Sequence, residues 1–384
     1  MSKTLLIIPH TYPDDTNPNI TPFIKEHSVA LCKAGYRVII LHVKILAMKK
    51  WKNGSETKIE KHIEDGIIRY CVSVRFVKGF ERLNTLKYCK QLERLFEYYL
   101  KQNGSADLLI SHFYQYAGIA ASTISKKHNI PWIAIEHAGW LLKEKIPAYE
   151  KKKLSRVCES ADRIICVSKE LEKYIRMHVE TNIINCSVIP NMIEDRFVFV
   201  PRKQKTDMVF FSAGNLLVGK RFDLLIKAFC SAFTKDENVK LRIAGAGNQY
   251  EKLSSLIHEN DRTNQISLLG SLTKSEMMNE YINCDCFALP SEHETFGIVY
   301  REALAVGRPI ITTDHQGFRN DSWNDKYGVR IDIDNINQLV DALIYMKNNI
   351  GIFNIQELSD ECRRTYSTSR IIEKYQTIIN NLVR

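Results

Sequence analysis

The sequence has no apolar run long enough to span a membrane and no cysteine pattern typical of disulfides or zinc sites. No hydrophobic stretch reaches the roughly 18 residues that a membrane-spanning helix needs. The N-terminus runs directly into an apolar strand pattern, without the apolar core and cleavage site of a secretory signal. The ten cysteines are scattered, and the one close pair is Cys284 and Cys286. We expect buried free thiols and a cytoplasmic protein.

The sequence also has no excess of acidic residues, because it contains 54 Lys and Arg but only 44 Asp and Glu. Residues 1–200 carry 31 basic and 21 acidic residues, whereas residues 201–384 carry 23 of each. Two basic stretches stand out, "KILAMKKWK" (44–52) and "WLLKEKIPAYEKKKLSR" (140–156). Such segments can lie on an anionic membrane surface, and a solvated helix face explains them equally well. No nucleic-acid-binding motif is present, so we expect no nucleic-acid partner.

Strand-like apolar runs alternate with helical patterns along all 384 residues, a length that favours two domains. In the first half the predicted strands are 5–9, 37–43, 107–112, 131–137, 163–168 and 187–191. In the second half they are 208–214, 240–245, 266–270, 286–291, 309–314 and 329–333. Near-continuous apolar strands separated by helices indicate parallel sheets with both faces covered.

The stretch 194–207 is charged, contains a proline and is interpreted as a linker. The predicted fold class is therefore α/β, with two Rossmann-like doubly wound parallel-sheet domains at residues 1–198 and 199–366. Ligands of such sheets bind beyond the carboxyl ends of the strands. The cleft between the two domains is thus the expected site.

Two glutamates, Glu294 and Glu302, flank the predicted start of a helix. The backbone N–H groups of Phe296, Gly297 and Ile298 would point outward there, which suits a diphosphate. Glu294, in the preceding loop, can accept hydrogen bonds from sugar hydroxyls, and Glu302, inside the helix, from a ribose. A helix cap and a surface ion pair would explain two isolated glutamates as well.

The stretch "LPSEHETFGIVYREALAVGRPIITTD" resembles the E-x7-E region of the family 4 glycosyltransferases, which adopt the two-domain GT-B fold. Further matching segments are "FFSAGNLLVGKRFDLLIKAF", "LRIAGAGNQYEKL", "ISLLGSLTKSEMMNEYINCDCFALPS", "ADRIICVSKEL", "VIPNMI" and "IPWIAIEHAGW". The resemblance covers most of the chain and is weakest at 44–105. It implies that a C-terminal helix at 367–384 packs back toward the first domain.

The resemblance implies a role for several residues on the donor side. Lys220 corresponds to the lysine that neutralises the donor diphosphate, and it follows Gly214 and Asn215 in the predicted phosphate loop. Glu294 corresponds to the acid near the donor sugar, and Glu302 to the acid on the nucleotide ribose. The same region supplies the helix start at Phe296, Gly297 and Ile298.

On the first domain, the resemblance implies that His137 lies near the transferred sugar. It also places His10 and Thr11, after the first strand, and Glu26, with His27 beside it, on the acceptor side. An isolated histidine would more often be a structural hydrogen-bonding group.

The sequence departs from the family at three places. An arginine is common where this chain has Asn215, so Lys220 would carry more of the phosphate charge. The first loop, 10–23, lacks a glycine pair seen in many members, which suggests a different acceptor shape. The segment "HQGF" (315–318) replaces a common Gly-Gly turn.

The resemblance implies a retaining hexosyltransferase that uses a nucleotide-sugar, a UDP-sugar rather than a GDP-sugar, and a glycan or lipid-linked acceptor in surface polysaccharide synthesis. It would act in the cytoplasm or peripherally on the cytoplasmic face of the membrane.

This scheme needs no metal and no cofactor. Asp332 and Asp334 are better explained as a turn and helix cap. "GAGNQY" (245–250) lacks the third glycine of an NAD fingerprint. Two alternatives stay open: a sugar-nucleotide epimerase of the same fold, and a catalytically inactive binding module derived from a transferase.

Overall fold

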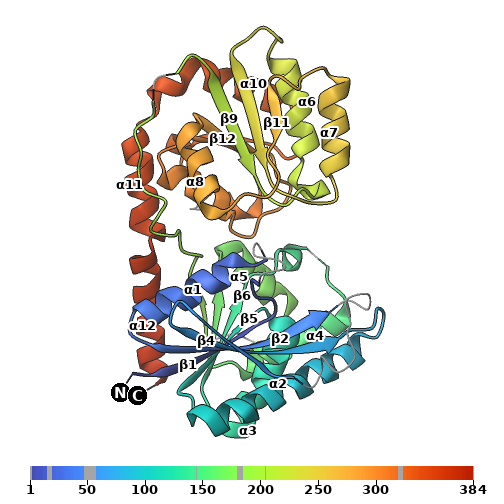
Figure 1. The fold of residues 1–384 in the computed structure, drawn as a ribbon, viewed down its shortest axis with the longest axis vertical. Helices are drawn as coiled ribbons and strands as arrows, with labels where there is room; N and C mark the ends of the chain where they lie inside the picture. The colour runs from blue at the N-terminus through green and yellow to red at the C-terminus, as the bar shows by residue number, and fades with distance from the viewer. Residues whose placement is uncertain are drawn as a thin grey trace. The chain divides into compact units, whose positions relative to one another are not determined.

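Two predominantly parallel sheets organise the chain in the computed structural model, which describes residues 2–14, 20–46, 58–143, 145–179, 185–203, 205–318 and 323–383. Helices cover both faces of each sheet (Figure 1). Contacts divide the chain into a first unit, Met1–Met192 with Ser369–Arg384, and a second unit, Ile193–Thr368. The predicted α/β class with two doubly wound sheets is confirmed.

The first unit contains an eight-stranded sheet of order β3-β4-β2-β1-β5-β6-β7-β8. Its strands are β1 Thr4–Pro9, β2 Arg37–Leu46, β3 Glu60–Glu64, β4 Ile67–Arg75, β5 Leu108–His112, β6 Trp132–Glu136, β7 Arg163–Cys166 and β8 Cys186–Val188. Its helices are α1 Pro22–Lys33, α2 Glu81–Asn103, α3 Ile119–His128, α4 Ala148–Ser160, α5 Lys169–His178 and α12 Thr368–Leu382. Short turns η2 Tyr114–Gly118 and η3 Gly139–Leu142 complete it.

The second unit contains a six-stranded parallel sheet of order β11-β10-β9-β12-β13-β14. Its strands are β9 Met208–Ala213, β10 Val239–Ala244, β11 Ile266–Leu268, β12 Cys286–Leu289, β13 Ile310–Thr313 and β14 Gly328–Ile331. Its helices are α6 Phe222–Ala232, α7 Tyr250–Glu259, α8 Lys274–Asn283, α9 Ile298–Ala305, α10 Ile336–Asn349 and α11 Ile355–Tyr366. Short 3-10 turns are η4 Val218–Lys220, η5 Gln316–Phe318, η7 Asp325–Tyr327 and η8 Ile350–Ile352.

The strand order places a switch point in each sheet. In the second unit the chain runs outward from β9 through β10 to β11 and then crosses to β12 on the other side. The loops after β9 and β12 therefore leave in opposite directions and open a crevice at their carboxyl ends. In the first unit the corresponding point lies between β1 and β5. These are the positions where ligands of doubly wound sheets bind.

The C-terminal helix α12 belongs to the first unit. Its apolar face, Ile371, Ile372, Tyr375 and Ile379, is buried in one cluster with strand residues such as Leu5. Figure 1 shows α12 beside the first unit's sheet, with both chain ends close together.

The stretch 194–207 is not a free linker, and the chain changes unit after Met192 rather than after residue 198. Phe197 is buried in the core of the second unit, and its carbonyl accepts a hydrogen bond from Arg363 at 2.8 Å. Arg308 donates to the carbonyl of Val200 at 2.8 Å. These contacts attach the segment to the second unit; residue 204 lies outside the described residues.

Two strands of the first sheet are absent from the sequence prediction. All five residues of β3 are exposed, so it has no apolar run, and it pairs with β4 as an antiparallel hairpin. The apolar run of β4 is interrupted by Arg69 and Ser73.

The cysteine prediction is confirmed, because all ten thiols are free and Cys284 and Cys286 are buried. Within the described ranges, no helix combines the length and the apolar character that crossing a membrane requires.

Candidate functional site

The switch point of the second unit brings together the loops that follow β9 and β12. The backbone N–H of Glu292 donates to the carbonyl of Gly219 at 2.9 Å. The hydroxyl of Ser291, which is fully buried, donates to the same carbonyl at 3.3 Å. The loop after β12 is thereby held against η4, which carries Lys220.

Lys220 and Glu294, both predicted from the sequence, form an ion pair in this crevice. Their side chains are 23% and 12% exposed, respectively, so the pair is largely desolvated yet reachable. The lysine stem extends over Gly214, where a Cβ would lie 3.9 Å from the Lys220 Cε. Asn215 is exposed beside it. An anionic ligand entering here would share or replace Glu294 as the partner of the lysine charge.

Arg221 is a member of the site that sequence reasoning missed. Its Nη1 lies 2.7 Å from a carboxylate oxygen of Glu292 and 2.7 Å from one of Asp334. The Arg221 backbone is left-handed, with φ 54°. This conformation is uncommon for a residue with a Cβ, and it marks Arg221 as a fixed connection between η4, the loop after β12 and the turn before α10. The sequence shows it as a second basic residue next to Lys220, which does not identify its acidic partners.

Asp332 and Asp334 are occupied by protein partners. Asp334 pairs with Arg221, and Asp332 accepts a hydrogen bond from the side chain of Gln338 at 2.9 Å. Among the residues that the structure describes, no group of three or more His, Cys, Asp or Glu could hold a metal ion. The two aspartates therefore have partners of their own, and the cap of α10 is Asn335, whose side chain accepts the N–H of Gln338 at 3.1 Å.

The N-terminus of α9 faces the same loop without a side-chain cap. Gly297 occupies the N-cap position with φ 74°, which favours glycine, and the first turn contains no acidic residue. Amide groups at a helix start carry partial positive charge and lack intrahelical acceptors. Phe296 and Gly297 are buried and Ile298 is half-buried. This arrangement has the chemistry of an anion site.

Glu302 lies one turn further along α9. Its carboxylate accepts a hydrogen bond from the hydroxyl of Tyr281 at 2.9 Å, and the same hydroxyl lies 3.0 Å from the carbonyl of Val299. Tyr281 is fully buried on α8, so it fixes the direction of the Glu302 side chain. Glu302 itself is half-buried.

The buried side chain of Arg301 holds the loop before α9 in place. Its Nη2 donates to the carbonyl of Gly317 at 2.7 Å and its Nη1 donates to the carbonyl of Phe296. The guanidinium lies over the Phe318 ring, 3.8 Å from the centroid. The segment "HQGF" thus has a structural role, because it binds Arg301. Within the segment, His315 Nδ1 accepts a hydrogen bond from the Gly317 N–H at 3.1 Å.

The glycines of "GAGNQY" serve close packing between loops. A Cβ on Gly245 would lie 1.9 Å from the carbonyl oxygen of Gly214, and one on Gly247 would lie 2.3 Å from that of Leu216. The N–H of Leu216 donates to the carbonyl of Ala246 at 2.9 Å. These glycines allow the close packing that supports the loop after β9, and this packing explains them without a bound dinucleotide.

In the first unit, the predicted acceptor-side residues have separate partners. His10 stacks on the ring of Tyr116 with centroids 5.3 Å apart, and burial lowers the pKa of His10 to about 4. The hydroxyls of Thr11 and Thr21 lie 3.1 Å apart. Glu26 is half-buried on α1. Residues 15–19 of the predicted acceptor loop lie outside the described residues.

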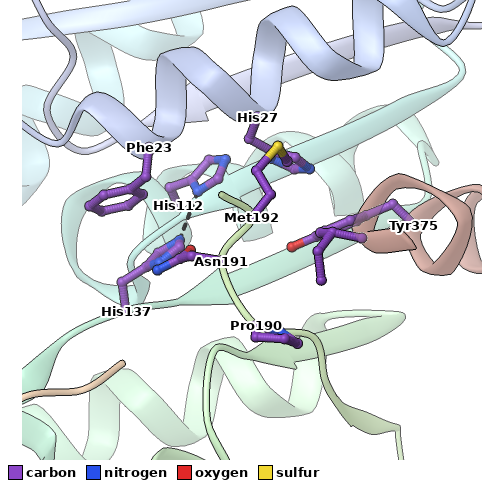
Figure 2. Close-up of a pocket in the computed structure, with 9 residues that line it drawn as sticks. Phe23, His27, His112, His137, Pro190, Asn191, Met192 and Tyr375 are labelled. Atoms are coloured by element: carbon purple, nitrogen blue, oxygen red, sulfur yellow. Dashed lines mark hydrogen bonds between the residues drawn. The ribbon is translucent and has the colours of Figure 1, made fainter. Parts of the chain in front are cut away.

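His137 lies in a cluster of three histidines (Figure 2). Its Nε2 is 3.0 Å from Nδ1 of His112, at the end of β5, and the two rings are stacked. His27 meets His112 edge-on with centroids 5.5 Å apart. Burial lowers the pKa of His137 to about 3, so its ring is neutral at ordinary pH. His27 is itself buried in this cluster.

Glu136 fixes the backbone that carries His137. One carboxylate oxygen accepts the N–H groups of His137 and Ala138, both at 2.8 Å, and the other accepts the N–H of Tyr114 at 2.7 Å. Glu136 is almost fully buried at the end of β6. Sequence reasoning missed it because a carboxylate that binds only backbone groups has no recognisable spacing.

We expect Glu136→Gln to lower the free energy of unfolding by about 1–3 kcal/mol, because the new amide NH2 would face the N–H of Tyr114 and leave a buried donor unpaired. Urea denaturation measures this difference. Equal midpoints for the two proteins would contradict the three-bond arrangement.

The stabilising contribution of Glu136 should also depend on pH. Burial raises its pKa from 4.5 to about 7, and the three N–H bonds oppose this shift. The folded state thus holds the proton more tightly than the unfolded state, and stability should fall as pH rises from 4.5 to about 7. Glu136→Gln, which does not titrate, should lack this component.

The leucines of the basic stretch 140–156 lie in the protein interior. Leu141 and Leu142 are buried, and the Trp140 ring packs against Tyr114 with centroids 5.7 Å apart. Lys153 lies 3.0 Å from Glu81. Leu141 and Leu142 are therefore unavailable to a membrane surface, and contact of this stretch with a membrane stays a prediction. Residues 47–52 of the other basic stretch lie outside the described residues.

Comparisons with known proteins place the chain among sugar transferases. Residues 194–363 match the family described as Glycosyl transferases group 1, and residues 22–197 match Glycosyltransferase Family 4. An uncharacterized glycosyltransferase of Methanocaldococcus jannaschii is 26% identical over 63% of this chain and 66% of that protein. The O-antigen biosynthesis glycosyltransferase WclY of Escherichia coli is 27% identical over 45% of this chain and 46% of its own length. The chain thus matches less than two thirds of either relative.

Two solved structures are similar over nearly the full length of both chains. Sucrose-phosphate synthase from Thermosynechococcus elongatus has a TM-score of 0.78 at 15% identity, covering 100% of this chain and 99% of that one. HepE of Anabaena, in complex with UDP and glucose, has a TM-score of 0.75 at 13% identity, covering 99% of this chain and 100% of that one. At these identities the likeness concerns the fold.

Proposed function

Because the chain belongs to the family 4 glycosyltransferases of GT-B fold, we propose that it transfers a hexose-type sugar from a nucleotide-diphosphate donor to a glycan or lipid-linked acceptor. The observation that carries the proposal is the Lys220–Glu294 pair, set at a switch point beside the uncapped start of α9. A UDP-sugar is the proposed donor, in line with the UDP bound by the Anabaena neighbour. Surface polysaccharide synthesis is the proposed pathway, in line with the O-antigen relative.

The proposed binding mode follows from the charges of the crevice. The diphosphate lies at the α9 amides of Gly297 and Ile298 and takes Lys220 as its counter-ion. Glu294 is then released from the lysine and accepts hydrogen bonds from sugar hydroxyls. Glu302, already oriented by Tyr281, accepts from the ribose. Arg221 holds the loop that carries Glu294 through Glu292.

The proposed reaction retains the anomeric configuration by front-face displacement. The bond between the anomeric carbon and the phosphate oxygen breaks, and the acceptor oxygen bonds to the same face of that carbon. The acceptor's proton passes to the departing phosphate oxygen. Lys220 and the α9 amides stabilise the charge that develops on the diphosphate. This scheme requires no metal or cofactor.

Residues of the first unit are assigned to the acceptor and the transferred sugar. His10, Thr11 and Glu26 are proposed to contact the acceptor, and His137 the sugar. The assignments rest on the family resemblance and on the position of His10 after β1, at that sheet's switch point.

A panel of nucleotide-sugars tests this function. We expect a UDP-sugar to raise the melting temperature, since a ligand at about 100 times its Kd stabilises the folded state by about 2.7 kcal/mol. Release of UDP should require an acceptor. Conversion of the donor sugar without any acceptor would instead identify an epimerase, and binding without turnover an inactive module. No response to any nucleotide-sugar would overturn the proposal.

Peripheral membrane contact through the basic first half is a further part of the proposal, since a lipid-linked acceptor would lie at a membrane. With Leu141 and Leu142 buried, charge alone would supply the attraction. We expect pelleting with anionic liposomes at low salt that is lost as salt rises, because ions screen such contacts. Failure to pellet at low salt would remove membrane contact and leave the transferase activity standing.

A further inference from the structure

A small cavity in the first unit is lined by three histidines that come from three different elements. His27 lies on α1, His112 ends β5 and His137 follows β6, while Tyr375 reaches the cavity from α12 (Figure 2). The space that the centre of a water molecule can occupy is about 10 Å³. That is about the volume that one buried water needs.

The hydrogen bond within this cluster does not use all of the ring nitrogens. Burial lowers the pKa of His27 and His137 to about 3 and that of His112 well below its usual range, so all three rings are neutral. Each neutral ring has one N–H donor and one lone pair. The bond between His112 Nδ1 and His137 Nε2 uses one donor and one acceptor. Two donors and two acceptors remain.

The remaining ring nitrogens have no partner in the part of the chain that the structure describes. They are both nitrogens of His27, Nε2 of His112 and Nδ1 of His137, and all four are buried. An unpaired buried polar atom costs about 1–3 kcal/mol. A water molecule both donates and accepts, and a polar site with two or more partners and sufficient volume binds one.

We propose that the cavity binds one water molecule, which bridges His27 to the His112–His137 pair and thereby holds His137 in a single neutral tautomer. The proton positions of His112 and His137 are linked through their hydrogen bond. If the water donates to Nε2 of His112, then His112 carries its proton on Nδ1 and donates to His137. His137 must then carry its own proton on Nδ1. If the water accepts instead, every proton in the chain shifts to the opposite nitrogen. One oriented water therefore selects one state for His112 and His137.

The consequence for catalysis rests on the proposed function. His112 occupies Nε2 of His137, so Nδ1 is the remaining ring nitrogen; it is buried, and the transferred sugar would reach it only after the side chains that cover it move aside. Its tautomer decides whether His137 donates to a sugar hydroxyl or accepts from it. His27 and His112 are positioning residues in this scheme, because they act only through His137.

A crystal structure of the full chain tests the water directly. We expect a density peak within about 3.2 Å of a His27 nitrogen and of His112 Nε2. A cavity without such a peak, in maps where other buried waters are visible, would overturn the proposal.

Histidine-labelled NMR tests the tautomer without any substrate. The two ring nitrogens of His137 should report one tautomer in the wild type. His27→Phe removes the bridge and should change the His137 signals to those of a mixture, whereas His27→Gln, which keeps a polar end, should shift them less. His128→Phe replaces a histidine that packs against Phe96 outside the cavity and should leave them unchanged.

Enzyme kinetics separates the proposed water from the proposed role of His137 in sugar transfer. With an identified donor, His27→Phe should lower kcat while KM for the donor stays the same. Loss of the single tautomer without a change in kcat would support the water and refute the role of His137. Unchanged His137 signals in both His27 variants would refute the water-bridged chain, whatever the activity.

Discussion

Replacing Lys220 with alanine is expected to lower kcat by about 10²–10³-fold, as the loss of one oxyanion-stabilising group does. The lysine is the counter-ion of the diphosphate in the proposed binding mode, and Asn215 beside it supplies no charge. The developing charge on the diphosphate would then lose this counter-ion and depend on the amide dipoles of α9. Single-turnover rates with the donor identified by thermal shift measure this loss. A kcat equal to that of the wild type would remove Lys220 from the mechanism.

Two variants make this result specific. Lys227→Ala removes an exposed lysine from α6 in the same unit and should leave kcat unchanged. Glu294→Gln keeps the shape of the carboxylate but breaks the ion pair with Lys220. If Glu294 serves the sugar, this variant should lose kcat although the lysine is freed for the phosphate. A gain in turnover would mean that Glu294 only restrains the lysine.

Replacing Arg301 with methionine is expected to lower the free energy of unfolding by about 2–5 kcal/mol. The guanidinium is 1% exposed and donates to the carbonyls of Phe296 and Gly317, on two separate segments. Both carbonyls would lose their donor, at about 1–3 kcal/mol each. Chemical denaturation followed by circular dichroism measures the change. Donor affinity should fall too, since Phe296 precedes the start of α9.

The geometry of the guanidinium can be tested separately from its charge. Arg301→Lys keeps the charge, but one ammonium cannot span two carbonyls as a planar fork does, so most of the loss should remain. Arg364→Met, at an exposed position of α11, should change stability by less than about 0.5 kcal/mol. Full stability of the Arg301→Lys protein would show that charge alone is needed.

The fold could be read from the sequence where strands are buried on both faces. Runs such as "LLIIP" and "CFALPS" have no polar interruption because helices cover both sides of these strands. The prediction failed for the edge hairpin of β3 and β4, where one strand is wholly exposed. It also failed at 194–207, whose charged residues hide the buried Phe197.

The candidate site was predictable where stretches of the sequence resemble the motifs of a known family, which is how Lys220 and Glu294 were assigned. Lys220 and Glu294 follow adjacent parallel strands and meet in the crevice at their ends. Arg221, Arg301 and Glu136 were not predictable, because their partners are backbone groups or acids from other segments. Only the structure shows that these three charged side chains hold loops in place.

The second unit is an insertion whose two ends are tied together. Ile193, its first residue, donates its N–H to the carbonyl of Tyr366 at 2.8 Å, and its carbonyl accepts from the hydroxyl of Thr368 at 3.2 Å. The polypeptide therefore enters and leaves this unit at one place, while the first unit holds both chain ends. A unit attached in this way should be exchangeable between related chains with cuts at its two adjacent ends, while the first unit keeps α12.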